Sequence, residues 1–311
     1  MFGTCFSGHA FARLRLAARC ACSFSGHAFA RLRLAARCAC SRAGRARRSA
    51  SLLALFAIAC GTLSVPEEQS LGRQMAGETR RGLVFVYDPV VQGYVRGIGE
   101  SILRAAGPQP FEYHFYVVED DQINAFAGPA GYIYIYTETI LAARNASELA
   151  GVIAHEIGHV QRRHIANNYN RQRNTQIGYR AAVLAAAMLG GGAAASAAQV
   201  GGGLAAVAYL NSFGREAEME ADSFAVETLP RAGYDPNGLV TFFETLQRES
   251  KGETTDFLSS HPATADRAQA AREQIAAHPP DPGLEVNDNG RLEIIQRRIE
   301  LLVGSRPAAR H

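Results

Sequence analysis

Two short runs of aromatic and β-branched residues stand out in the first half of the chain. They occupy residues 111–118 (FEYHFYVV) and 131–137 (GYIYIYT) and are bounded by Gly, Pro and Asp. Such runs are typical of β-strands. The connection at 124–131 (NAFAGPAG) is rich in turn-forming residues and predicts a loop. In the second run Tyr and Ile alternate, so the two residue types should lie on opposite faces of a sheet.

Helical patterns dominate the rest of the chain. Asn145 and Glu148 resemble a capping box and predict a helix that runs through Ala166. Residues 64–107 are mixed, with a helical centre. Further helices are predicted at 216–229, 239–249, 263–277 and 291–303. The pattern as a whole therefore predicts an α+β fold with a small sheet and a helix-rich C-terminal half.

Residues 181–214 carry no charged side chain. A single membrane crossing needs about 20 residues and would divide the motifs described below between the two sides of a membrane. Two glycine triplets, at 190–192 and 201–203, would also weaken a continuous helix. We favour a lid or a packed helical pair over a membrane span.

The net charge of +3 conceals an uneven distribution. Residues 1–60 contain ten of the 32 basic residues and no acidic residue, which leaves 22 basic against 29 acidic residues and a net charge of −7 in the remainder. The total therefore gives no support for nucleic-acid binding by the remainder of the chain.

The N-terminal 59 residues resemble a leader. Residues 6–23 recur without change as 24–41, which indicates a recent duplication and disfavours a metal site at the two Cys-x-Cys pairs. A basic stretch at 42–48 and an apolar run at 52–59 then form a secretory signal. The signal ends in Ala-Ile-Ala-Cys60, which resembles a bacterial lipobox and predicts a lipid on Cys60; ordinary signal cleavage is the alternative.

The strongest chemical signal is His155-Glu156-Ile-Gly-His159. Histidines four residues apart share a helical face and can reach one metal ion, while the Glu between them can take a proton from water. Zinc needs a third protein ligand. Glu218 and Asp222 are also four apart, so one could bind the metal while the other supports a ligand, whereas Glu216 and Glu220 should point elsewhere.

These motifs, together with His261-Pro262 and Arg267, resemble the HtpX/BepA-like zinc metallopeptidases. That family also includes the CAAX prenyl protease and the mitochondrial Oma-type enzymes. The resemblance covers about 67–277 and implies a zincin-like fold with one Zn²⁺. It makes Glu218 the third ligand beside His155 and His159, Glu156 the catalytic base, and Asp222 the residue that orients His155.

The same resemblance suggests regulation at the His-Pro motif. In some periplasmic members a His on this loop closes the open zinc position, which would be His261 here. Arg267 would hold the oxyanion or orient the loop; simple packing is the alternative for both. The segment 124–131 reads NAFAGPAG, where the family usually has NAFALPGG. His164, five residues after His159, should turn away from the ligands and be structural.

Taken together, the sequence predicts three segments: a leader at 1–59, a metallopeptidase domain at 60–277, and a tail at 278–311 with a possible helix. The predicted activity is zinc-dependent cleavage of misfolded or unassembled envelope proteins by a lipoprotein on the periplasmic side of the outer membrane. An envelope chaperone or assembly factor with a mostly closed zinc site is the alternative. In zincin proteases a strand at the edge of the sheet pairs with the extended substrate. The predicted strand at 132–136 is a candidate for that edge strand; an interior strand is the alternative.

Overall fold

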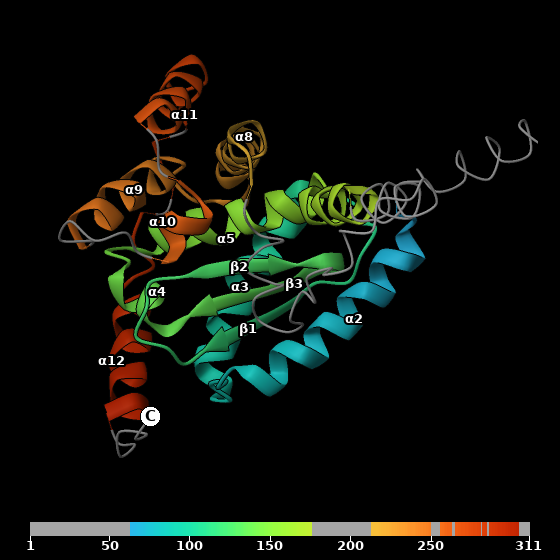
Figure 1. The fold of residues 1–311 in the computed structure, drawn as a ribbon. Coiled ribbons are helices and arrows are strands. Elements are labelled where there is room, and N and C mark those ends of the chain that lie inside the picture. Colours follow the sequence, from blue (N-terminus) through green and yellow to red (C-terminus); the bar gives the residue numbers. More distant parts are fainter. Residues whose placement is uncertain are drawn as a thin grey trace, which may run out of the picture. The chain divides into compact units, whose positions relative to one another are not determined.

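The computed structural model describes residues 63–175, 213–249, 256–262, 265–280, 282–284 and 286–304. Within these residues, helices pack around one three-stranded sheet (Figure 1). The predicted α+β fold class is therefore confirmed. The duplicated leader, Cys60 and residues 181–212 of the uncharged segment lie outside the described residues. None of the described helices is both long enough and apolar enough to span a bilayer.

Two capped helices precede the sheet, where the sequence indicated only a helical centre. They are α2 (Val65–Gly82) and α3 (Pro89–Ala106). Ser64 and Glu67 form a capping box at the start of α2, and Asp88 accepts hydrogen bonds from two backbone N–H groups at the start of α3. Asp88 also binds Arg298 of α12 (Arg291–Gly304) at 2.7 Å. One side chain thus caps α3 and ties the last helix to it.

The sheet has the order β1-β3-β2, with β1 (His114–Val118) parallel and β2 (Ala125–Gly128) antiparallel to β3 (Tyr132–Tyr136). Both predicted strands are confirmed, but the prediction of a loop over 124–131 was wrong for its first half. Ala125–Gly128 is a buried strand because it pairs with β3, and only Pro129–Gly131 turns the chain. Since β3 is the central strand, its residues cannot form the sheet edge.

The helix after the sheet begins where the sequence predicted and ends earlier. After α4 (Thr137–Ala142), α5 spans Ala146–Gln161 with Asn145 as N-cap. The predicted end at Ala166 was wrong because Arg163 adopts a left-handed conformation with φ of 55°. Residues 164–175 are helical again. The chain therefore changes direction just after the His-Glu-x-x-His motif.

The C-terminal half supplies α8 (Arg215–Ala232) and α9 (Asn237–Glu249), which pack on α5. After the short α10 (Asp256–Ser260), α11 (Ala265–Ala277) packs on α8 and α9. Figure 1 shows α5 between the sheet and this group, and contacts of α5 with β2, β3, α8 and α9 agree with that view. α5 is therefore enclosed, and every residue from Ala146 to Val160 is buried.

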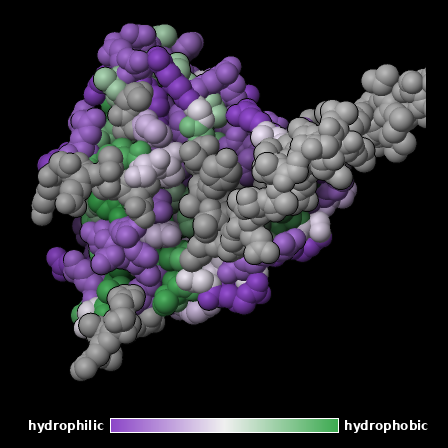
Figure 2. Space-filling model, in the orientation of Figure 1, coloured by the Kyte–Doolittle hydropathy of each residue, from purple (hydrophilic) through white to green (hydrophobic). Residues whose placement is uncertain are grey.

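The core lies between the sheet and α5. Ile133 and Ile135 of β3 and Leu149, Ile153 and Ile157 of α5 are all fully buried in one apolar cluster. Burial of each such side chain contributes about 1.5–3 kcal/mol relative to exposure. Polar residues cover much of the visible described surface, with smaller apolar patches between them (Figure 2). These hydrophobic contacts therefore hold α5, the helix that carries the His-Glu-x-x-His motif, firmly against the sheet.

Candidate metal centre

The N-terminus of α5 is anchored by local hydrogen bonds. Asn145 accepts a hydrogen bond from the Glu148 backbone N–H at 2.9 Å, as the sequence predicted. The Glu148 carboxylate accepts from the Arg144 backbone N–H instead of returning to Asn145. It also forms an ion pair with the Arg144 side chain. These contacts fix where the helix starts, and hence which of its faces carries His155 and His159.

α8 approaches α5 closely at Gly158. A Cβ atom at this glycine would lie 3.1 Å from the Cα and carbonyl oxygen of Ala221. Such contacts are tighter than ordinary side-chain packing, so the glycine of the motif permits the two helix backbones to meet. The close approach brings Glu218, three residues before Ala221, to the two histidines.

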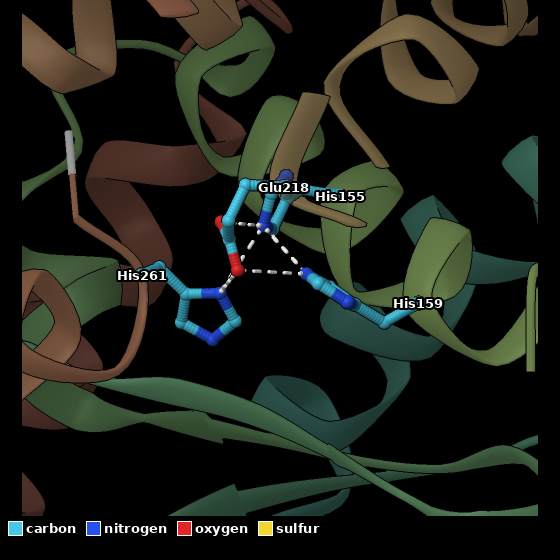
Figure 3. Close-up of side chains that lie close together, drawn as sticks. All are labelled: His155, His159, Glu218 and His261. Carbon is cyan, nitrogen blue, oxygen red and sulfur yellow. Dashed lines mark hydrogen bonds and ion pairs between the residues drawn. The ribbon is translucent and has the colours of Figure 1, made fainter. Parts of the chain in front are cut away.

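His155, His159 and Glu218 converge on one point (Figure 3). The Nε2 atoms of the two histidines are 3.0 Å apart. Glu218 places Oε2 at 3.4 Å from His155 Nε2 and Oε1 at 3.5 Å from His159 Nε2. All three side chains are at most 2% exposed. The structure thus brings together the three residues that the sequence proposed as metal ligands.

Asp222 and Arg267 lie directly behind this group. The His155 Nδ1 atom is 2.9 Å from Asp222 Oδ1, while its Nε2 atom faces the cluster. Arg267 donates to both oxygens of Asp222, at 2.7 and 2.8 Å, and lies 2.8 Å from Glu218 Oε2. It also donates to the Pro262 carbonyl at 2.9 Å. These contacts favour the loop-orienting role for Arg267 over oxyanion binding.

Glu156 lies beside the cluster without belonging to it. Its side chain is fully buried, and neither carboxylate oxygen has a hydrogen-bond partner among the described residues. Burial raises the pKa of this carboxyl above its ordinary value. Buried carboxylates normally find partners because desolvation is costly. A general base needs a carboxylate oxygen within reach of the water it deprotonates, and Glu156 offers two oxygens beside the cluster.

His261 enters the cluster from the loop that follows α10. Its Nδ1 atom is 3.0 Å from Glu218 Oε1 and 3.3 Å from His155 Nε2. Its Nε2 atom is 3.6 Å from Glu156 Oε1. Phe257 of α10 stacks on the ring at a centroid distance of 4.9 Å. The four residues His155, His159, Glu218 and His261 each offer one ligand atom, all within 4.8 Å of one another.

The charges of the cluster are strongly coupled. Burial disfavours the charged form of His155, but the Asp222 and Glu218 carboxylates outweigh it and raise the pKa of His155 to about 9. Burial, together with the His155 charge, holds the pKa of His159 well below its ordinary value. Burial would raise the pKa of Glu218, yet the His261 and His155 rings hold it well below the ordinary value. Because a histidine ligand must be neutral at the metal-binding nitrogen, a metal ion and a proton compete for His155.

His164, which the sequence predicted to turn away from the ligands, and Phe213, which it did not single out, both contact His159. His164 Nδ1 lies 3.0 Å from His159 Nδ1, and His164 Nε2 lies 3.0 Å from Glu220 Oε2. Glu220 thus lies outside the ligand cluster and contacts it only through His164. Phe213 stacks on the His159 ring at 4.0 Å. Helical periodicity could not have found His164, because the chain leaves the helix at Arg163.

The donor set fits a transition metal such as zinc. Two imidazole nitrogens and one carboxylate oxygen are typical zinc ligands, and a catalytic site adds a fourth position. His155 has the outer carboxylate partner that ligating histidines usually have. The unsatisfied Glu156 carboxylate adjoins the same point. The residues present therefore suit a metal ion.

Comparison with known proteins agrees with this geometry. The model of peptidase family M48 matches residues 89–275. The chain belongs to peptidase family M48. This membership confirms the resemblance drawn from the motifs at 155–159 and 218–222 and the zincin-like α+β architecture. The matched region of the M48 domain contains all seven residues that the sequence proposed for the site: His155, Glu156, His159, Glu218, Asp222, His261 and Arg267.

Several curated relatives are metalloproteases by name. A beta-barrel assembly-enhancing protease of Yersinia pestis is 30% identical over 236 residues, which cover 74% of this chain and 48% of the relative. Metalloprotease LoiP of Escherichia coli K12 is 32% identical over 54% of this chain and 64% of its own length. The mitochondrial metalloendopeptidase OMA1 of Arabidopsis thaliana is 30% identical over 49% of this chain and 30% of its own length. The chain thus spans about half the length of the assembly-enhancing protease.

Proposed function

We propose that this M48 protein is a zinc-dependent endopeptidase of the bacterial cell envelope. The observation that carries the proposal is the convergence of His155, His159 and Glu218 beside the buried, unsatisfied carboxylate of Glu156. The names of the relatives support hydrolysis of peptide bonds.

In this proposal His155, His159 and Glu218 hold the zinc ion. Bound zinc supplies Lewis acidity toward a peptide carbonyl and makes water nucleophilic at neutral pH. Glu156 accepts the proton of the attacking water and passes it to the leaving amine. Asp222 holds His155 in the orientation that directs Nε2 at the metal, and Arg267 holds Asp222 and the loop that carries His261.

The proposed substrates are unfolded or unassembled envelope proteins. The name of the Yersinia relative points to β-barrel assembly, and barrels of this kind are outer-membrane proteins. We further propose attachment through a lipid on Cys60, with the enzyme on the periplasmic side of the outer membrane. The signal-like segment before Cys60 supports this location.

Metal analysis and a cleavage assay on the full chain test the central proposal. We expect about one zinc per chain and cleavage of casein, since three protein ligands are enough for a catalytic zinc site. Removal of zinc by a chelator should abolish cleavage, and re-addition of Zn²⁺ should restore it. Cleavage that persists after complete removal of the metal would contradict the proposal.

The position of His261 favours a second candidate, an envelope assembly factor whose zinc site is mostly closed. His261 Nδ1 already lies among the ligand atoms. In the closed arrangement, the His261 ring would compete with substrate for the fourth position of the metal.

Replacement of His261 by Ala separates the two candidates. If the ring closes the site about 90% of the time, the variant should cleave casein up to about tenfold faster. Zinc content should remain unchanged, because three ligands stay in place. His278→Ala, at an exposed histidine, is the matched control. If both the wild type and His261→Ala bind zinc and neither cleaves casein, the result would support the assembly factor instead.

A further inference from the structure

We infer that His164 and Glu220 form a positioning pair that sets the orientation and tautomer of His159 for metal binding. The inference rests on the proposed zinc site and extends it to residues that bind no metal themselves. Glu220 lies on α8, the helix that also carries Glu218 and Asp222. One helix would thus supply a metal ligand and the carboxylates behind both histidine ligands.

The hydrogen-bond directions follow from the position of the metal. His159 can bind metal only through Nε2, the atom that faces His155 and Glu218. Its proton must then reside on Nδ1, which donates to His164 Nδ1 at 3.0 Å. His164 therefore accepts at Nδ1 and carries its own proton on Nε2. That proton is donated to Glu220 Oε2 at 3.0 Å, so the carboxylate selects the tautomer of His164 that can accept from His159.

The fold delivers His164 to this place by breaking α5. Arg163 adopts φ of 55°, a left-handed conformation that strains a residue other than glycine. Its guanidinium is held by Glu68 of α2 at 2.7 Å, and the Glu68 side chain is 1% exposed. Arg163 also donates to the Leu63 carbonyl. Without this turn, a residue five positions after His159 would lie on a different face of the helix.

The two histidine ligands are therefore supported in different ways. His155 Nδ1 lies 2.9 Å from Asp222 Oδ1, in direct contact with its carboxylate. His159 instead reaches a carboxylate through the His164 ring. His164 is 7% exposed, and Phe213 stacks on the face of the His159 ring at a centroid distance of 4.0 Å. On the side away from the metal position, the His159 ring is held by its Nδ1 contact with His164 and by stacking on Phe213.

A pair of variants with side chains of nearly equal shape tests the inference. In His164→Asn the side-chain oxygen can take the place of Nδ1 as acceptor, whereas His164→Leu has the same shape without an acceptor. The zinc affinity of the full chain is measured by competition with a chromophoric chelator. We expect His164→Leu to weaken zinc binding about 10–100-fold, as loss of an outer partner of a metal ligand does. His164→Asn should recover most of that loss.

A purely structural role for His164 would give a different result. It would lower the thermal midpoint of the metal-free protein while leaving the zinc affinities of the Asn and Leu variants equal, and that outcome would overturn the inference. So would a His164→Leu variant that binds zinc as tightly as the wild type. A wild-type chain that binds no zinc would refute the proposed function itself, so the two failures are distinguishable.

A second variant keeps the test decisive if His164→Leu does not fold. The Glu220 side chain is 50% exposed, so Glu220→Ala should fold normally. It should weaken zinc binding several-fold, and less than His164→Leu, because the acceptor on His164 remains but its tautomer is no longer selected. Glu216→Ala, at an exposed position of the same helix, is the control and should bind zinc as the wild type does. Equal affinity of the Glu220 and Glu216 variants would overturn the inference.

Discussion

Replacement of Glu156 by Gln is expected to lower casein cleavage on the order of 10²–10⁴-fold, the usual contribution of a general base. A loss of 10³ corresponds to about 4 kcal/mol in the activation free energy. Gln has nearly the same shape as Glu and cannot accept the proton. Because Glu156 lies outside the ligand set, the zinc content of the variant should equal that of the wild type.

The stability of the same variant distinguishes catalysis from structure. Burial raises the pKa of Glu156, so its ionised form is disfavoured in the folded protein relative to the unfolded chain. The favourable contribution of this group is present below the unfolded pKa and is lost as the pH rises through the folded pKa. At neutral pH the Gln variant should therefore be at least as stable as the wild type, which thermal unfolding measures.

Two results would contradict the role assigned to Glu156. One is a Glu156→Gln variant that retains the wild-type rate with full zinc content. The other is a loss of activity that merely parallels a fall in the thermal midpoint, which would indicate a structural residue.

Replacement of Glu218 by Gln is expected to remove zinc from the purified protein. Loss of an outer partner weakens metal binding about 10–100-fold, so loss of a direct charged ligand should weaken it by more than about 100-fold. Casein cleavage should disappear with the metal. Metal analysis after dialysis against a weak chelator measures the effect.

Glu216→Gln is the matched control for this experiment, because it makes the same change at an exposed position two residues earlier on α8. It should retain zinc and activity. The pKa of Glu218 is lowered in the folded protein, so its stabilising contribution is present above the unfolded pKa and lost as the pH falls. Glu218→Gln should therefore also lower the thermal midpoint at neutral pH. Full zinc retention by a folded Glu218→Gln variant would mean that another group is the third ligand.

The motif helix could be predicted because its signals are local. The Asn145 cap and the four-residue spacing of His155 and His159 act within one or two helical turns, so the sequence predicts both the start of α5 and the shared face of its histidines. The close spacing of Glu218 and Asp222 is equally local. Both face the cluster in the structure.

Other features depend on contacts between distant segments. The strand Ala125–Gly128 has too little β-propensity of its own to be recognised, and it forms because it pairs with β3. The end of α5 depends on the ion pair between Arg163 and Glu68, which lie 95 positions apart in the sequence. His261 is positioned by the Phe257 ring and by the Phe257 N–H, which donates to the Ile123 carbonyl at 3.2 Å.

By itself, the sequence determined the α+β class, the histidine pair with its adjacent Glu156, and the two acidic residues from which a third ligand would come. Only the tertiary structure decided the order of the strands, the partners of Arg267, the entry of His261 and the chain from His159 through His164 to Glu220. The physical reason is the range of the interactions. Helix caps and ligand spacing act over a few residues, whereas the surroundings of each ligand come from elements that pack together only when the whole domain folds.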